Sequence, residues 1–251
     1  ASSEEYTYPR DVISTFKTPP RDDRVGHGEA LVRNAEEASK QAQAAAKANP
    51  PAEKPKGIVL DFRSDPSFKL QLKSLEIQRS GIELRNSRIV DDVMHATVFV
   101  PEGKLGIFTR KFEAYVKENH PKSGKPKNQN LVDSISEIRL AALESFWTDA
   151  GTFPNDDSDV IWWEVWLRDS AGTPDVVVQF REKAEAKNIT VGPRELRFPE
   201  RRVLLARATV KQWTLFENLF DILAELRLAK TLPGEFLQLP PRDQAEFVED
   251  T

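Results

Sequence analysis

The chain has three histidines that could act as a general base: His27, His95 and His120. A Ser-His-Asp triad requires a nucleophilic hydroxyl held beside such an imidazole. His27 lies between two glycines, His95 begins an expected strand and His120 ends an expected helix, so we interpret all three as structural or solvated. The sequence lacks a Gly-x-Ser-x-Gly elbow, a P-loop, a His-Glu-x-x-His motif and the Rossmann glycine pattern. We therefore predict that this chain contains no catalytic residue and is not itself an enzyme.

Two charged stretches could bind ions, but neither has the required pattern. Residues 155–159 (NDDSD) are rich in carboxylates, yet they lack the spacing, the glycine and the terminal glutamate of an EF-hand calcium loop. Residues 122–127 (KSGKPK) could contact phosphate, but no aromatic side chain is interleaved with the lysines. We interpret both stretches as solvated surface loops, and we predict no metal site and no cofactor.

The composition limits the classes of partner. Lys and Arg number 36 against 40 Asp and Glu, a net charge of -4, so no overall basic field attracts nucleic acid. Cysteine is absent, which excludes disulfides and thiol chemistry and leads us to expect a cytoplasmic location. No apolar run approaches the roughly 20 residues that cross a bilayer, so no membrane association is expected. Because the first residue is Ala1 and not Met, we expect that the start was processed or trimmed.

The first 56 residues are expected to precede the folded units. Residues 1–23 are polar and contain three prolines, which indicates an extended arm. Residues 29–46 are rich in Ala, Glu, Gln and Lys. They predict a thin, mostly solvated helix, because Leu31, Val32 and alanines are its only apolar side chains. The Pro-rich residues 49–56 are interpreted as a linker.

Residues 57–150 are predicted to form a first folded unit. Asp65 and Pro66 are expected to cap and open a helix that presents Phe68, Leu72 and Leu75 on one face. The expected order is strand 58–62, the helix from residue 65, strands 82–89 and 96–100 and helix 103–118. Residues 131–141 are compatible with a strand or a helix, and we interpret them as a strand by analogy with the second half.

Residues 158–230 repeat this order. We expect strand 160–168, a helix capped by Thr173 and Pro174, strands 196–198 and 203–209, helix 212–220 and a final strand. Residues 130–141 align without gaps with residues 218–229, and Asn, Leu, Asp, Glu, Arg, Leu and Ala are identical in both, which indicates an internal duplication. The predicted fold class is α+β, with two tandem ferredoxin-like (βαββαβ) units followed by a C-terminal tail, residues 231–251.

Two helices cover only one face of a ferredoxin-like sheet, so the other face of each unit is expected to be bare. In strand 160–168, alternation sends Ile161, Trp163, Val165 and Leu167 toward the helices and Trp162, Glu164, Trp166 and Arg168 to the bare side. The second set is our candidate docking surface. Two interpretations stay open: the tryptophans are covered by this chain's own neighbouring unit or N-terminal helix, or they bind a partner.

The paired residues Glu137 and Arg139, and likewise Glu225 and Arg227, are expected to share one face of a strand. They could maintain the fold or form an electrostatic docking patch.

Six stretches together resemble a known family. They are RVGHG (24–28), LEIQRSGIEL (75–84), ATVFVPEGKL (96–105), IRLA with FWTD (138–141 and 146–149) and WWEVWL (162–167). They resemble the N-terminal, non-catalytic region of bacterial subtilisin-like (S8) serine proteases of the type found beside AAA ATPases, over about residues 24–250. In that family the catalytic domain follows this region, so no catalytic residue is carried over.

The resemblance implies a propeptide-like module that docks on, chaperones or inhibits a subtilisin-like protease domain through an open sheet face. It also implies that the C-terminal tail runs toward the substrate cleft, with Phe247, Val248, Glu249, Asp250 and Thr251 nearest to it. If Thr251 is a processing end, Val248 fits the apolar subsite that such proteases favour. Ordinary subtilisin propeptides have one such unit, so the resemblance leaves open which unit docks.

Two other function classes stay open. The chain could be an adaptor or scaffold that binds an AAA ATPase or a target protein, or an RNA-binding ferredoxin-like protein, which the negative net charge disfavours.

Overall fold

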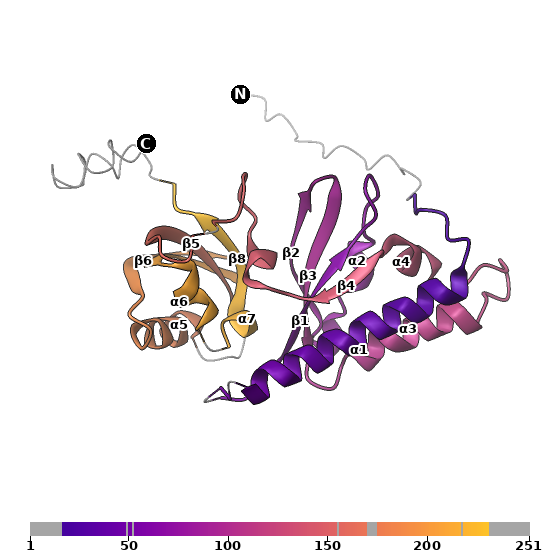
Figure 1. Ribbon diagram of the computed structural model, residues 1–251, viewed down its shortest axis with the longest axis horizontal. Coiled ribbons are helices and arrows are strands. Elements are labelled where there is room, and N and C mark those ends of the chain that lie inside the picture. The colour runs from indigo at the N-terminus through magenta and orange to yellow at the C-terminus, as the bar shows by residue number, and fades with distance from the viewer. Residues whose placement is uncertain are drawn as a thin grey trace, which may run out of the picture.

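The computed structural model describes residues 17–48, 50–51, 53–154, 156–169, 175–216 and 218–230. Two four-stranded antiparallel sheets lie side by side, and one long N-terminal helix, α1 (Arg24–Ala48), runs along the outside of the first (Figure 1). No helix in these residues is long and apolar enough to cross a membrane.

The first sheet has the strand order β2-β3-β1-β4, with all neighbours antiparallel. This is the ferredoxin-like arrangement that the sequence predicts. Its elements are β1 (Gly57–Arg63), α2 (Leu72–Leu75), a 3-10 turn (Gln78–Ser80), β2 (Glu83–Val90), β3 (Val93–Pro101), α3 (Gly106–Lys117), α4 (Gln129–Ser134) and β4 (Glu137–Leu140).

The second sheet has the corresponding order, β6-β7-β5-β8, and confirms the tandem repeat. Its elements are β5 (Ile161–Arg168), α5 (Val176–Glu185), β6 (Thr190–Phe198), β7 (Arg201–Ala208), α6 (Val210–Thr214), α7 (Leu219–Ile222) and β8 (Leu223–Leu228). The matching sequence stretches occupy matching places. Ile138 of β4 pairs with the first strand of its unit at Phe62, and the aligned Leu226 of β8 pairs with the first strand of the second unit at Val165.

Helix α1 contributes to the core of the first unit. Leu31, Ala35 and Ala38 are buried in the same cluster as Phe108 and Phe112 of α3. A Cβ atom on Gly28 would lie 2.4 Å from the side chain of Val116, so the glycine permits close approach of the two helices. The predicted solvated helix therefore has one buried face, and its remaining residues are exposed or half-buried.

Helix α1 lies on the unit whose first internal helix is nearly absent. The helix expected from Asp65 does not form, because Ser67 adopts a left-handed conformation with a φ of 66°, and only the single turn α2 follows. Arg21, just before α1, docks here: it forms an ion pair with Asp65 at 2.6 Å and donates to the carbonyl oxygen of Asp133.

Two other predictions about single elements were wrong. Residues 131–141 form the end of α4 and then β4, and not one strand; Asn128, with a φ of 58°, precedes the helix. Residues 212–220 are divided between α6 and α7, and Asn218 again has a positive φ of 53° before the second.

The expected cap Thr173–Pro174 lies outside the described residues. Instead, the Asp175 side chain caps α5 by accepting hydrogen bonds from the backbone N–H groups of Val177 and Val178.

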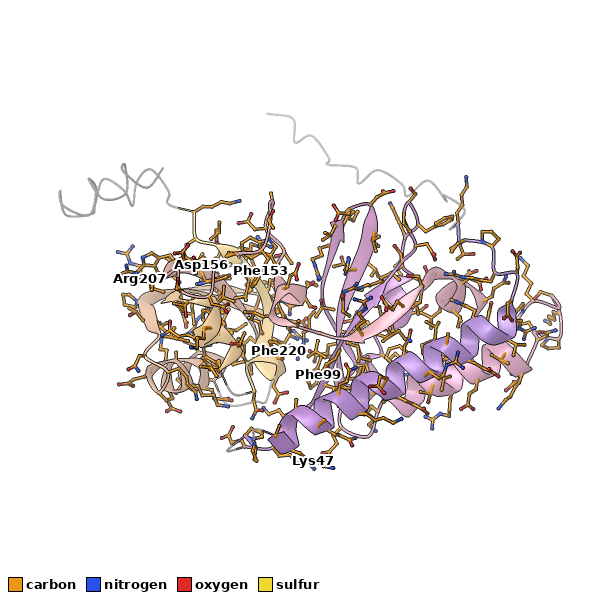
Figure 2. All side chains as sticks on the ribbon, in the orientation of Figure 1. Lys47, Phe99, Phe153, Asp156, Arg207 and Phe220 are labelled. Carbon is orange, nitrogen blue, oxygen red and sulfur yellow. The ribbon has the colours of Figure 1, made fainter. Side chains whose placement is uncertain are left out.

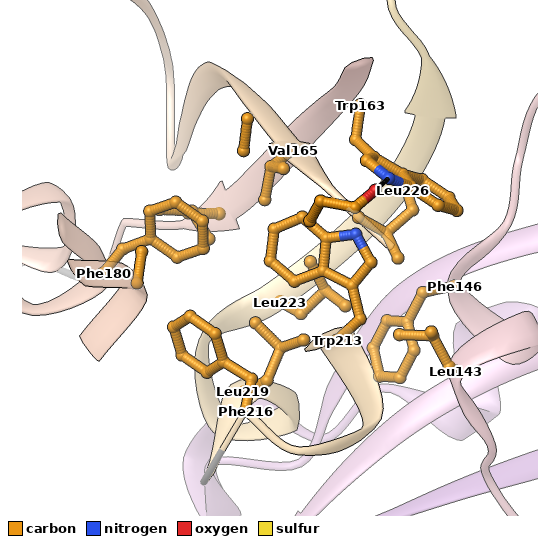
Figure 3. Packing of buried hydrophobic residues seen from close by; sticks show 14 of the residues in the cluster. Leu143, Phe146, Trp163, Val165, Phe180, Trp213, Phe216, Leu219, Leu223 and Leu226 are labelled. Carbon is orange, nitrogen blue, oxygen red and sulfur yellow. Dashed lines mark hydrogen bonds between the residues drawn. The ribbon is translucent and has the colours of Figure 1, made fainter. Parts of the chain in front are cut away.

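The prediction of a bare face is wrong for the first sheet. Its Val59 and Phe99 are buried in one continuous cluster with Leu143 and Phe146 of the linker helix η2 (Leu143–Phe146) and with the core of the second unit. Leu143 and Phe146 lie beside Trp213 and Leu226 in Figure 3, and Phe99 lies near Phe220 at the junction in Figure 2. The two units therefore form one packed body, because apolar residues of the linker and second unit fill the face that helices leave open.

Candidate docking face

The open face of the second sheet is built by alternation along its strands. Trp162, Glu164 and Trp166 of β5 lie opposite Arg207, Leu205 and Val203 of β7, and Glu164 and Trp166 lie opposite Arg227 and Glu225 of β8 on the other side. Directly opposed residues in an antiparallel sheet share a face. Trp163, Val165 and Leu167 point the other way and are fully buried, as predicted. The structure thus brings three of the four predicted docking residues together.

Trp166 is half-buried and held rigidly on this face. Its ring stacks on Phe198 with 5.4 Å between centroids and 16° between planes. The guanidinium of Arg227 lies 4.6 Å from the Trp166 ring, and the Trp166 Nε1 donates to Glu164. An aromatic ring fixed on both sides in this way loses little conformational entropy when a partner covers it.

Trp162 is the exposed tryptophan, with 43% of its surface accessible. Leu205 (37%), Phe198 (47%) and Leu196 (62%) are also exposed on the same face. Arg207 lies opposite Trp162, and in Figure 2 it lies on the side of the second unit away from the first. We call Trp162, Leu196, Phe198, Leu205 and Arg207 the open-face patch. Such an apolar group beside a guanidinium is typical of a protein-binding surface.

Arg168, the fourth predicted docking residue, is used within the chain. Its Nε lies 3.0 Å from a carboxylate oxygen of Glu83 in β2, and its Nη1 lies 2.8 Å from Glu200. Its side chain is 17% exposed. Arg168 therefore links the two units instead of facing a partner, so the docking face ends before this position.

The predicted pairs of charges do share strand faces. Arg139 lies 2.8 Å from Glu137, and Arg227 lies 2.6 Å from Glu225. The second pair also contacts the linker, since Thr148 donates to Glu225 at 2.7 Å. The predicted tail residues Phe247, Val248, Glu249, Asp250 and Thr251 lie outside the described residues.

Within the part of the chain that the structure describes, no histidine contacts a hydroxyl nucleophile. His27 donates from Nε2 to the carbonyl oxygen of Val132 at 3.1 Å, and burial lowers its pKa. The Nδ1 of His95 lies 3.1 Å from Asp61 on the covered face of the first sheet. Burial acts to raise the pKa of Asp61, but the hydrogen bond and charge of His95 and the charge of Arg88 lower it overall. His120 is exposed.

Neither charged loop forms an ion site among the described residues. Asp156 accepts hydrogen bonds from the backbone and hydroxyl of Ser158, and Lys127 pairs with Glu118. No group of three or more His, Asp or Glu residues there could hold a metal ion.

Sequence reasoning missed a cluster of charges where the two units meet. It contains Glu83, Arg85, Arg168, Arg201 and Asp221. Glu83 and Arg85 alternate with the apolar residues Ile82 and Leu84. Charged residues at every second position are also typical of a strand face in contact with solvent, so the sequence carried no signal that a second unit buries them.

Comparison with known proteins matches part of the chain to a family model. Residues 25–142, from helix α1 through β4, match the family model described as the Y4kK N-terminal domain. No curated protein and no solved structure matches the chain. The matched region combines α1 with the first sheet, in agreement with their shared core.

Proposed function

We propose that this chain is a propeptide-like, non-catalytic module that docks on a subtilisin-like serine protease domain and chaperones or inhibits it. The observation that carries the proposal is the open-face patch, where Trp162 and Leu205 are exposed beside Arg207 on a rigid sheet. The same face of the first sheet is buried within the chain. This favours the second unit as the one that docks.

The position of the last described residues supports a link between docking and the tail. The backbone N–H of Ala229 donates to the carbonyl oxygen of Trp162 at 3.1 Å. The chain therefore leaves β8 beside the exposed tryptophan, and a protease bound at Trp162 would lie close to Lys230, the last described residue. A cytoplasmic location, consistent with the absence of cysteine, is part of this proposal.

Charge and shape define the partner surface. Arg207 is exposed, whereas Glu164 is bonded to Trp166 and Glu225 to Arg227. Among the described residues Arg207 has no ion-pair partner, so the patch presents apolar area with a cationic rim, beside the carboxylate of Glu164. A complementary partner has an apolar groove flanked by carboxylates.

The proposal is tested by adding this chain to a separately produced subtilisin-like catalytic domain encoded with it, and measuring binding and peptide cleavage. We expect binding that slows cleavage, and a loss of binding in Trp162→Ala. Leu215→Ala removes an apolar side chain that is 57% exposed and lies outside this face, and it serves as the matched control. Selective binding of an AAA ATPase in a pull-down would favour the adaptor function instead. Salt-sensitive binding of single-stranded oligonucleotides would favour RNA recognition.

A further inference from the structure

A pocket of about 200 Å³ lies where the two units meet, and none of its lining residues belongs to the open-face patch. Both units contribute to its walls. The lining residues of the first unit are Lys56, Glu83, Arg85, Phe99 and Pro101, and those of the second are Arg168, Val176, Gln179, Asp221 and Ile222.

Arg85 is the most unusual residue of this pocket. Its side chain is 3% exposed, and burial lowers its pKa to about 10. Its Nη2 donates to the carbonyl oxygen of Asp221 at 3.0 Å, and the guanidinium lies 4.8 Å from the ring of Phe99. Among the described residues, its Nε and Nη1 have no hydrogen-bond acceptor. A buried, charged donor without an acceptor is costly, so these N–H groups favour an added acceptor.

Each carboxylate that lines the pocket has one oxygen engaged. One oxygen of Glu83 lies 3.0 Å from Arg168 Nε and 3.5 Å from Arg85 Nη1, too far from the latter for a hydrogen bond. Asp221 accepts from the backbone N–H of Lys56 at 3.0 Å. Neither carboxylate provides a hydrogen-bond acceptor to Arg85 Nε or Nη1.

The charge of the lining also favours an anion. Lys56, Arg85 and Arg168 are three cations against the two carboxylates of Glu83 and Asp221. Burial raises the pKa of Asp221.

We propose that this pocket binds the carboxylate of a small organic acid, with Arg85 as the buried donor and Lys56 as a cation at the entrance. Phe99, Pro101, Val176 and Ile222 supply apolar contacts for a short alkyl group, which inorganic phosphate lacks. The volume is below the usual range for drug-sized ligands, about 300–1,000 Å³, so it suits a molecule of a few heavy atoms. A bound carboxylate would contact both units at once. The inference is independent of the proposed protease docking.

The test is calorimetric titration of the whole chain with sodium butyrate and, separately, with sodium phosphate, at constant ionic strength maintained with sodium chloride. We expect saturable butyrate binding and a shift of one buried arginine Nε–H signal in ¹H–¹⁵N spectra. Arg85→Met should weaken butyrate binding about 10-fold or more, since it removes a charged hydrogen-bond donor. Lys56→Ala changes an exposed side chain and should weaken binding about 2- to 5-fold without affecting folding. Lys122→Ala, in an exposed loop, should bind like the parent chain.

Absence of saturable butyrate binding would overturn the proposal. Unchanged affinity in Lys56→Ala together with Arg85→Met would also overturn it, because binding would then occur elsewhere. Binding of phosphate without butyrate would overturn the assignment to a carboxylate. If Arg85→Met does not fold, the arginine Nε–H signal of the parent chain and the affinity of Lys56→Ala decide the question.

Discussion

Replacing Phe146 by Ala should uncouple the two units. Phe146 is fully buried in the linker helix η2, and its ring lies 4.7 Å from that of Phe220. It belongs to the cluster that joins Val59 and Phe99 of the first unit to the core of the second. Truncating a buried phenylalanine costs about 3–5 kcal/mol. For a chain of this length, this corresponds to a decrease in Tm of about 6–20 °C, at roughly 2–4 °C per kcal/mol.

The tryptophans make the coupling measurable. All five lie in the linker or the second unit, at Trp147, Trp162, Trp163, Trp166 and Trp213. Their fluorescence therefore reports the second unit, whereas far-UV circular dichroism also reports the helices α1 and α3 of the first. In urea, we expect the two signals to change together in the parent chain and at different urea concentrations in Phe146→Ala.

Phe198→Ala is the control of the same residue type. Phe198 is 47% exposed on the open face, so its truncation should cost about 1 kcal/mol or less and leave the two signals coincident. Coincident transitions in Phe146→Ala, with a loss below about 1 kcal/mol, would refute the inference that the linker joins the two cores.

Three further predictions follow from single contacts. Trp163→Ala should lower the free energy of unfolding by about 3–5 kcal/mol, because Trp163 is fully buried, whereas Trp162→Ala should change it by less than about 1 kcal/mol; urea unfolding of both compares them directly. Glu83→Gln should lower the free energy of unfolding by about 1–3 kcal/mol, because it weakens the ion pair with Arg168. Glu113→Gln weakens an exposed ion pair and should cost less than about 0.5 kcal/mol; an equally small loss for Glu83→Gln would contradict the prediction. The parent chain should lose stability as the pH falls from about 6.5 through the lowered pKa of His27, because the unfolded chain binds that proton more readily. The free energy of unfolding of a His27→Gln variant should depend less on pH in this window. An identical pH dependence in both proteins would contradict the effect.

The alternation of side chains between the two faces of each strand made much of the fold predictable. In β5, alternation separated buried Trp163 from exposed Trp162, because each side chain of a half-buried strand meets either the core or the outer face. The recurrence of strands and helices predicted two ferredoxin-like units, and both sheets have that strand order.

What sequence reasoning missed depends on contacts between distant segments. The alanines of α1 predicted a helix, but alanine is compatible both with a solvated face and with close packing against α3, so its partner was not visible. Leu143 and Phe146 lie in a short connection, where no periodicity indicates which sheet they cover. Arg168 was assigned to docking because it follows Trp166 on the same face, yet the position of Glu83 decides its role.

The central claim is that the open-face patch binds a protease domain. The most direct test is the dissociation constant of a subtilisin-like catalytic domain for the parent chain and for Trp162→Ala and Leu205→Glu. A charge placed in an apolar contact and the loss of a central tryptophan should each weaken binding about 30-fold or more, which corresponds to about 2 kcal/mol or more. Leu215→Ala should bind like the parent chain. Equal affinity for all four proteins, or no binding by the parent chain, would contradict the claim.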